Sequence, residues 1–464
     1  MSCMAGHRQM TPGKGAGALI GLLLEAGDPY AALGAYPHAE AGAQPALERI
    51  ILSGPRLRLI VAAAPYAPAG LLDRLSHGAG EAVALRLVKN PATPVAALDR
   101  LLRNAADERL RRYIAAHPQA DAAILSRLAA DGAIEVRRAV AGNAHAPAAV
   151  IARLAAEDDG QMMRNAAAAP QADAPTLRGL WHAADPWVRA EVAAHPNCPA
   201  EIVSEAAAAA DPLIRRKCAA NPAIDGETLS RLLSDPDERV RAAAVRNPAV
   251  SGDCLDEAGD PSAKVRRHFA RRSRLAPVLL AQLAADPDVW VRRWIARNPD
   301  LTGDLLGQMA ADPRMEVRRS VARNPSCPPR LLQVLGADPQ PWVRAGVALR
   351  DDLPGPVITL LADEQDRDVL GALGRNPRAP AAQLDAIARH PDKDVRRSVA
   401  LNPAAPAAAL ALLAADPYPL NRAILAGHPG LPLSLAEGLL HDPEPQVRFA
   451  AAARLARAAA AGRS

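Results

Sequence analysis

The feature of this sequence that most restricts its fold is a repeat of about 26 residues that runs through almost the whole chain. Its clearest marker is an Asn-Pro pair, and the Asn position recurs at Asn90, His117, Asn143, Ala169, His195, Asn221, Asn247, Arg272, Asn298, Asn324, Arg350, Asn376, Asn402 and His428. Weaker matches at Tyr36 and Ala64 bring the total to about sixteen units. One unit of this size cannot bury its own apolar face, so its copies must stack on each other. The strict period therefore predicts a solenoid.

The stretch 312–335, DPRMEVRRSVARNPSCPPRLLQVL, shows how one unit is expected to fold. Asp312 precedes a proline, and such a pair favours a helix start, because the carboxylate caps free N–H groups and proline loses no bond there. Asn324 also precedes a proline, which disfavours the helical conformation of the residue before it and so ends the helix. A second short helix, α or 3₁₀, is expected to begin at Pro328 and to bury its leucines.

The repeat leaves little of the 464 residues outside it, so one solenoid is expected in place of several compact domains. Its regularity divides the chain into a flexible N-terminus (1–16), degenerate N-terminal capping repeats (17–104), regular repeats (105–449) and a C-terminal capping helix with a tail (450–464). The apolar run 18–24 is interpreted as part of the N-terminal cap, not as a secretory signal. No segment has the roughly 18 apolar residues of a membrane span, so a cytoplasmic protein is expected.

The unit DPxxxVRRxVARNPxxPxxLLxxL resembles the leucine-rich repeat variant family, and more distantly HEAT-type repeats, over about residues 50 to 450. The resemblance implies a right-handed superhelical solenoid in which α-helices and 3₁₀ helices alternate. Some family members also carry an N-terminal domain whose clustered cysteines hold a 4Fe–4S cluster. This chain has only Cys3 near its start, so that domain is not expected, and neither is a cofactor.

Two columns of opposite charge run through the repeats. One holds the first Arg after the recurring Val: Arg111, Arg137, Arg189, Arg215, Arg241, Arg266, Arg292, Arg318, Arg344, Arg396, Arg422 and Arg448. The other holds Asp near the helix start: Asp185, Asp211, Asp235, Asp260, Asp286, Asp312, Asp338, Asp416 and Asp442. These columns are interpreted as a structural ladder of Arg on carboxylates or carbonyls of adjacent units. Asn and His share the marker column because both place a nitrogen donor near the helix end, so local backbone bonding is expected there.

A second Arg column is more informative about function. In three successive repeats an Arg of this column is followed, four residues on, by another Arg: Arg267 and Arg271, Arg293 and Arg297, and Arg319 and Arg323. Like charges at this spacing cost a helix about 0.2–0.5 kcal/mol per pair, so folding alone does not require them. Residues 264–330 hold thirteen Arg and one Lys against five Asp and one Glu, a net charge of +8. At helix spacings of roughly 8–10 Å, six arginines would extend over about 20–30 Å, which fits a run of phosphates or an acidic protein segment.

Tryptophan accompanies these arginines. Trp290 and Trp342 stand just before the Val of their repeats, where other repeats carry polar residues such as Glu316, so the rings are expected to face solvent. Trp294 lies on the same expected helix as Arg293. Exposed aromatic residues among arginines indicate a contact patch. The alternative is that the rings only cover neighbouring loops and prolines.

The sequence therefore predicts a non-catalytic scaffold that binds a protein partner with an acidic surface. The predicted binding residues are Arg267, Arg271, Arg293, Arg297, Arg319, Arg323, Trp290, Trp294 and Trp342. The alternative is binding of a nucleic-acid backbone by the same arginines. An enzyme is a distant third possibility. It ranks last because the chain has no phosphate-binding Gly-rich loop, no zinc-ligand spacing and no nucleophile motif. No metal, catalytic or cofactor-binding residue is predicted.

Overall fold

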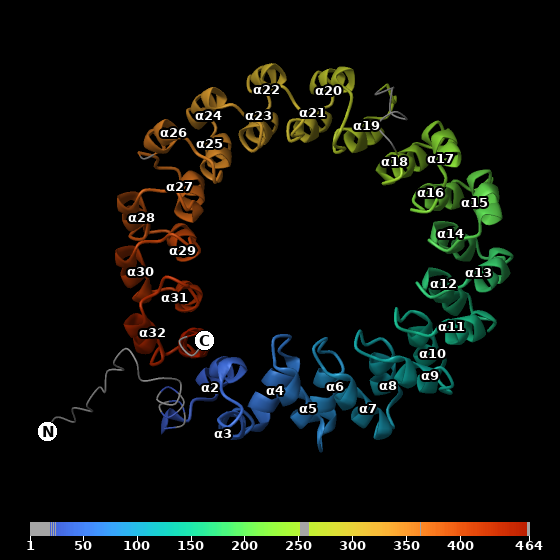
Figure 1. Cartoon of the computed structure of the whole chain (residues 1–464), viewed down its shortest axis with the longest axis horizontal. Coiled ribbons are helices and arrows are strands. Elements are labelled where there is room, and N and C mark those ends of the chain that lie inside the picture. The colour runs from blue at the N-terminus through green and yellow to red at the C-terminus, as the bar shows by residue number, and fades with distance from the viewer. Residues whose placement is uncertain are drawn as a thin grey trace. The chain divides into compact units, whose positions relative to one another are not determined.

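The structure is a computed structural model that describes residues 19, 21, 23, 25–250, 259–361 and 363–461, so the predicted flexible segment 1–16 lies outside it. The described residues form helices joined by short turns, with no strand among them (Figure 1). Each regular repeat contributes a first helix, which in most repeats carries the Val-Arg element, and most of the described second helices carry leucines. The all-α repeat solenoid expected from the sequence is confirmed.

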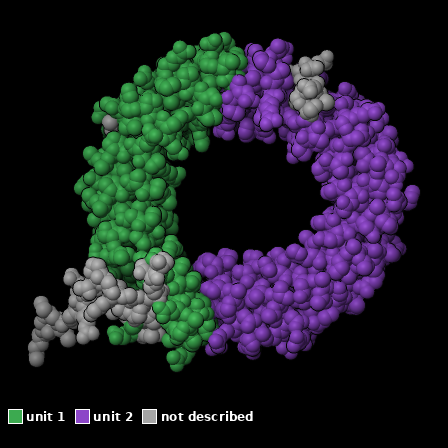
Figure 2. All heavy atoms as spheres, in the orientation of Figure 1, with its two compact units in different colours: residues 1–57, 301–464 green, residues 58–300 purple. Residues whose placement is uncertain are grey.

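The chain forms two compact units (Figure 2). Unit 1 combines Met1–Leu57 with Leu301–Ser464, and unit 2 is Arg58–Asp300. Within each unit the first helices form one layer and the second helices form another (Figure 1).

The first helices of unit 2 are α6 (Glu81–Leu87), α8 (Glu108–Ala115), α10 (Ile134–Ala141), α12 (Gly160–Ala168), α14 (Pro186–Ala194), α16 (Pro212–Ala219), α18 (Glu238–Arg246), α19 (Ala263–Phe269) and α21 (Val289–Ile295). Its second helices are α5 (Ala69–Ser76), α7 (Val95–Arg103), α9 (Ala122–Leu128), α11 (Ala148–Ala155), α13 (Ala174–Trp181), α15 (Ala200–Ala207), α17 (Gly226–Leu233) and α20 (Pro277–Ala284). Helix α4 (Pro55–Ala63) contains the chain boundary between the units.

The first helices of unit 1 are α2 (Pro29–Ala35), α23 (Met315–Ala322), α25 (Pro341–Ala348), α27 (Arg367–Arg375), α29 (Lys393–Ala400), α31 (Pro419–Ala426) and α33 (Pro445–Ala461). Its second helices are α3 (Gln44–Ile51), α22 (Gly303–Met309), α24 (Pro329–Gly336), α26 (Gly355–Leu360), α28 (Ala381–Ile387), α30 (Ala407–Ala414) and α32 (Leu433–Leu439). The short helix η1 (Tyr36–His38) follows α2.

The second helices are α-helical, which differs from the alternation of α and 3₁₀ helices that the family resemblance implies. They run from six residues in α26 to nine in α7. Among the described residues only η1 is a 3₁₀ helix. An α-helix places side chains at i, i+3 and i+4 on one face, so apolar side chains such as Leu229 and Leu232 of α17 reach the core together.

The core lies between the two layers. In α10, Val136 and Val140 stand four residues apart and are both fully buried, and Leu125 of α9 and Ile151 of α11 are buried opposite them. Burying one such side chain stabilises the fold by roughly 1.5–3 kcal/mol. No helix of the described part of the chain has both the length and the apolar character that crossing a bilayer requires.

The Asp-Pro pairs do not all begin a helix, contrary to the expectation for Asp312. Helix α23 begins at Met315 with Arg314 at its N-cap, and Asp312 accepts a hydrogen bond from the Arg314 N–H at 2.8 Å within the preceding turn. Asp185 and Asp211 do cap their helices, α14 and α16. The Asp column read from the sequence therefore combines two positions, one at the cap and one in the turn before it.

The first and last repeats of the array pack against each other within unit 1. Helix α2 lies along α33, and Arg448 of α33 forms an ion pair with Asp28, the N-cap of α2. The approach is close at Gly34, where an added Cβ would stand 2.1 Å from the carbonyl oxygen of Phe449. The segments expected to cap the two ends of the array thus contact one another.

Candidate binding surface

The first Arg column forms the structural ladder that its spacing predicts. In unit 2, Arg215 donates from Nε to Asp235 at 2.7 Å and from Nη2 to the same carboxylate at 3.0 Å, while Nη1 donates to the Ala209 carbonyl at 2.8 Å. The same contact recurs in Arg111–Asp131, Arg137–Glu157, Arg241–Asp260, Arg266–Asp286, Arg318–Asp338, Arg344–Glu364, Arg396–Asp416, Arg422–Asp442 and Arg448–Asp28. These arginines hold consecutive repeats together, so they are not part of a binding surface.

The marker column also joins repeats, where only local bonding was expected. The Asn221 side-chain amide donates to the carbonyls of Ala193 and His195, both at 3.0 Å, in the preceding repeat. Its Oδ1 accepts from the Ala223 N–H at 2.9 Å, and this bond is the local one. His195 makes one of the two carbonyl contacts, to Ala169 at 2.9 Å, and accepts from the local Asn197 N–H at 3.0 Å, which explains why Asn and His exchange in this column.

The second Arg column is neutralised in some repeats by the Asp that caps the next repeat. In unit 2, Arg267 donates to both carboxylate oxygens of Asp288, at 3.0 and 2.7 Å. This guanidinium holds the pKa of Asp288 below its usual range. Arg138 meets Asp159 in the same way. Arg267 is thus a paired residue, although the sequence predicts it as part of the binding surface.

The other arginines predicted in unit 2 stack on the predicted tryptophans. The guanidinium of Arg271 lies 3.8 Å from the ring centroid of Trp294, and that of Arg297 lies 5.5 Å from the same ring. Arg293 stands 4.8 Å from the centroid of Trp290, whose side chain is exposed. Each contact is a cation–π interaction worth about 0.5–1 kcal/mol at an exposed site.

The remaining predicted residues lie in unit 1. Arg319 stands 4.4 Å from the ring centroid of Trp342, which is half exposed, and the indole N–H of Trp342 donates to Asp368 at 3.3 Å. Arg323 is exposed at the end of α23. Trp290 and Trp342 thus face solvent as expected, with arginines on their faces, while Trp294 is half-buried. The alternative, in which the rings serve only to cover loops and prolines, does not account for this stacking.

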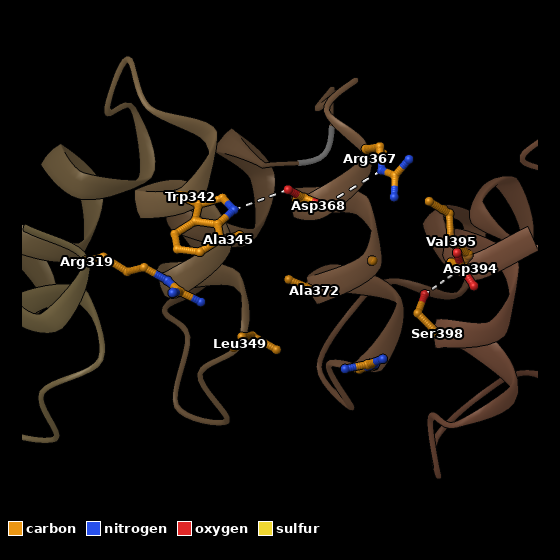
Figure 3. A pocket seen from close by; sticks show the side chains of 12 residues that line it. Arg319, Trp342, Ala345, Leu349, Arg367, Asp368, Ala372, Asp394, Val395 and Ser398 are labelled. Atoms are coloured by element: carbon orange, nitrogen blue, oxygen red, sulfur yellow. Dashed lines mark hydrogen bonds and ion pairs between the residues drawn. The ribbon is translucent and has the colours of Figure 1, made fainter. Parts of the chain in front are cut away.

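Arg319 and Trp342 also line one end of a cavity of about 320 Å³ between α23, α25, α27 and α29 (Figure 3). Its other walls carry Arg367, Asp368 and Asp394. The cavity arises because the second Arg column holds Ala345 and Gly371 between Arg319 and Arg397. Small residues in two successive repeats leave the space that two arginine side chains would fill.

Sequence reasoning missed Arg367, Asp368 and Asp394 as lining residues. The sequence does show that Gly371 replaces an Arg of the second Arg column. This replacement indicates a cavity only once the side chains of that column are known to line one surface. The three described cysteines are not candidates for chemistry. Burial raises the pKa of the Cys198 and Cys327 thiols to about 11 and that of Cys218 to about 12, so they stay protonated at neutral pH.

Comparisons with known proteins found similar solved structures. It is similar to a solved structure described as "A leucine-rich repeat variant with a novel repetitive protein structural motif", with 27% identity over 53% of this chain and 88% of that chain and a TM-score of 0.32. A second solved structure, described as "Kap95p Binding Induces the Switch Loops of RanGDP to adopt the GTP-bound Conformation", shares 12% identity over 97% of this chain and 58% of that chain, with a TM-score of 0.21. No protein-family model and no curated protein matches the chain.

Proposed function

We propose that this chain is a non-catalytic scaffold that binds an acidic segment of a protein partner through its stacked Arg and Trp residues. The supporting observation is the set of guanidinium groups on indole faces, with Arg271 on Trp294 at 3.8 Å as the closest. Stacking uses the flat face of the guanidinium and leaves its in-plane N–H groups able to donate to a carboxylate. The ring also fixes the side chain beforehand, which lowers the entropy lost on binding.

The same geometry favours a protein over a nucleic acid. Single-stranded nucleic acids are bound by open aromatic faces on which bases stack, but arginines of this chain already lie on the faces of Trp290, Trp294 and Trp342. A continuous phosphate track also requires unpaired cations, whereas Asp288 neutralises Arg267. A single carboxylate, in contrast, can bind to one guanidinium that a ring holds in place, so it does not require a continuous row of unpaired cations.

The proposal is tested separately in each unit by fluorescence anisotropy with a labelled peptide rich in Glu and Leu. A peptide with Gln in place of Glu is the control ligand. The unit 2 variant is Arg271→Lys with Arg293→Lys, and the unit 1 variant is Arg319→Lys with Arg323→Lys. Lysine keeps the charge but loses the stacked fork. We expect each double variant to bind the acidic peptide at least tenfold more weakly.

Arg330→Lys with Arg389→Lys is the matched control, because both arginines are exposed and lie outside the surface. It should bind the peptide as the unchanged protein does, and circular dichroism should show equal folding of all variants. Equal binding by all three variants contradicts the proposal. Tighter binding of a 20-base-pair duplex than of the peptide, with a steep loss of affinity on raising the salt, would instead establish the nucleic-acid alternative.

A further inference from the structure

A second cavity, of about 350 Å³, lies wholly within unit 2 and outside the predicted surface. It is formed by α16, α18 and α19 and is lined by Arg216, Arg239, Arg246, Lys264 and His268 over a floor of alanines. None of these five residues belongs to the Arg and Trp set of the proposed function. A basic cavity of this size therefore calls for its own explanation.

The cavity has the same origin as the one in unit 1. The second Arg column reads Arg216, Ala242 and Arg267 in three successive repeats, so the middle repeat lacks the long side chain. Ala220 is likewise small where the following repeats carry Arg246 and Arg271. Missing side chains at these two positions open a space, and the arginines of the adjacent positions border it.

The cations around this space exceed the anions. Among the described residues, no carboxylate forms an ion pair with Arg216, Arg239 or Arg246. Asp237, which corresponds to the neutralising Asp288, caps α18 by accepting from the Arg239 N–H at 2.7 Å. Glu238 is the one acidic lining residue, and it binds the Lys264 ammonium at 2.7 Å.

The positive charge around the cavity also affects the pKa of His268. Burial, together with the nearby charges of Arg246 and Arg271, lowers the pKa of its imidazole. The ring is therefore neutral at pH 7 and can donate or accept a hydrogen bond without adding to the charge. Folding gains nothing from bringing these cations together, since like charges repel.

We propose that this cavity binds a compact phosphate compound with two or more negative charges. The lining holds one further cation, Lys217, which is paired with Glu191 at 2.7 Å, as Lys264 is with Glu238. The three arginines Arg216, Arg239 and Arg246 therefore remain for a ligand. A phosphoryl group concentrates about two charges and three acceptor oxygens in a small volume, and arginine forks match its geometry. A carboxylate supplies one charge on two oxygens, so it places less charge against each arginine fork than a phosphoryl group does. The alanine floor leaves room for a small aliphatic body, and none of the described lining residues is Phe, Tyr or Trp.

Isothermal titration calorimetry at 50 mM salt tests the site with inorganic pyrophosphate, glycerol phosphate and succinate as probes. We expect saturable binding of pyrophosphate with a Kd below about 1 mM, weaker binding of glycerol phosphate, and no saturation by succinate. The variant Arg246→Gln with Lys264→Gln should weaken pyrophosphate binding at least tenfold. Arg239→Gln alone should weaken it less, because one cation is lost.

Arg330→Gln with Arg389→Gln is the matched control, since it removes the same charge at exposed positions of unit 1. Equal weakening by this control would show a non-specific charge effect and overturn the site. Absence of saturable pyrophosphate binding would overturn it too, as would succinate binding of equal strength. The outcome is independent of the acidic-peptide experiment, because the two sets of test variants share no residue and only the control positions are the same.

Discussion

At the scale of single residues, the marker column carries more of the structure than its local role suggests. Asn221 is fully buried and satisfies two carbonyls of the preceding repeat and one N–H of its own. An unsatisfied buried polar group costs about 1–3 kcal/mol. We expect Asn221→Ala to destabilise the protein by about 3 kcal/mol, measured by urea unfolding followed by circular dichroism.

Two further substitutions isolate the cause. Asn221→His should cost less than Asn221→Ala, because His195 keeps one carbonyl contact and the local N–H contact one repeat earlier. Asn104→Ala removes the same side chain at an exposed position and should change stability by less than about 0.5 kcal/mol. Equal stability of the Ala and His variants at position 221 would contradict this account.

The pair of Arg138 and Asp159 makes stability depend on pH. The Arg138 guanidinium lowers the pKa of Asp159 to about 2 in the folded protein, against about 3.9 for a free Asp. A lowered folded pKa stabilises the fold above the unfolded value, and this contribution is lost as the pH falls from about 4 toward 2. Asp159→Asn keeps the N-cap but removes the charge.

We therefore expect Asp159→Asn to be less stable than the unchanged protein at pH 7 and nearly equal to it near pH 2. The measurement is the urea midpoint of both proteins at several pH values. The remaining carboxylates titrate in both proteins. Only the difference between the two curves of urea midpoint against pH therefore reports on Asp159. A difference that does not change with pH would contradict the assignment.

Some of these residue contacts could be predicted from the sequence and others could not. The ladder could, because Arg and Asp recur at a fixed spacing and opposite charges attract. Neutralisation of Arg267 was not predicted, because Asp288 belongs to the cap position and was not separated from the turn position of Asp286. The direction of the Asn221 amide was not predicted either, because composition shows a donor without showing which repeat supplies the acceptor.

At the scale of elements, the contact of α2 with α33 depends on a glycine. A Cβ on Gly34 would stand 2.1 Å from the Phe449 carbonyl oxygen, and this backbone atom cannot rotate away. We expect Gly34→Ala to destabilise unit 1 by about 1–3 kcal/mol through this overlap. Hydrogen exchange should become faster in α2 and α33 before it changes elsewhere.

Gly307→Ala is the matched control, because Gly307 lies in α22 of the same unit and has nothing within 4 Å of an added Cβ. It should stabilise the protein by up to about 1 kcal/mol, the difference in helix propensity. Unchanged exchange in α2 and α33 of Gly34→Ala would mean that the two helices do not pack as described.

Element boundaries were the part of the fold that sequence reasoning placed least well. The Asp-Pro signal at Asp312 is genuine, but it marks the turn before α23, because the side chain of Asp312 accepts from the Arg314 N–H and delays the helix to Met315. The packing of α2 on α33 could not be predicted from the sequence. The 26-residue repeat predicts contacts between successive repeats, but not between the first repeat and the last.

At the scale of the whole molecule, the chain order differs from the order of the compact units. Unit 1 is built from both ends of the chain, Met1–Leu57 and Leu301–Ser464. We expect a circular permutant that starts at Leu301, ends at Asp300 and joins Ser464 to Met1 to fold. The junction would contain 21 residues, 462–464 and 1–18.

The permutant should show the same far-ultraviolet circular dichroism and a Tm within about 5 °C, because α33 and α2 would become ordinary neighbours in one unit. The new termini fall at the point in the chain where unit 2 ends and unit 1 resumes. A permutant combined with Gly34→Ala should lose this stability. A permutant that is unfolded at 20 °C would contradict the packing of the two ends.

The small residues within the second Arg column have a further consequence. Ala242 opens one cavity, and Ala345 with Gly371 opens another, on helices whose backbones are otherwise alike. In such an array, a cavity forms where a small residue replaces a long side chain, and the neighbouring arginines give the cavity its positive charge. The positions of the small residues thus determine where a ligand could bind. Exchanging Ala for Arg at one repeat and Arg for Ala at the next would shift a recess by a single step without redesigning the framework.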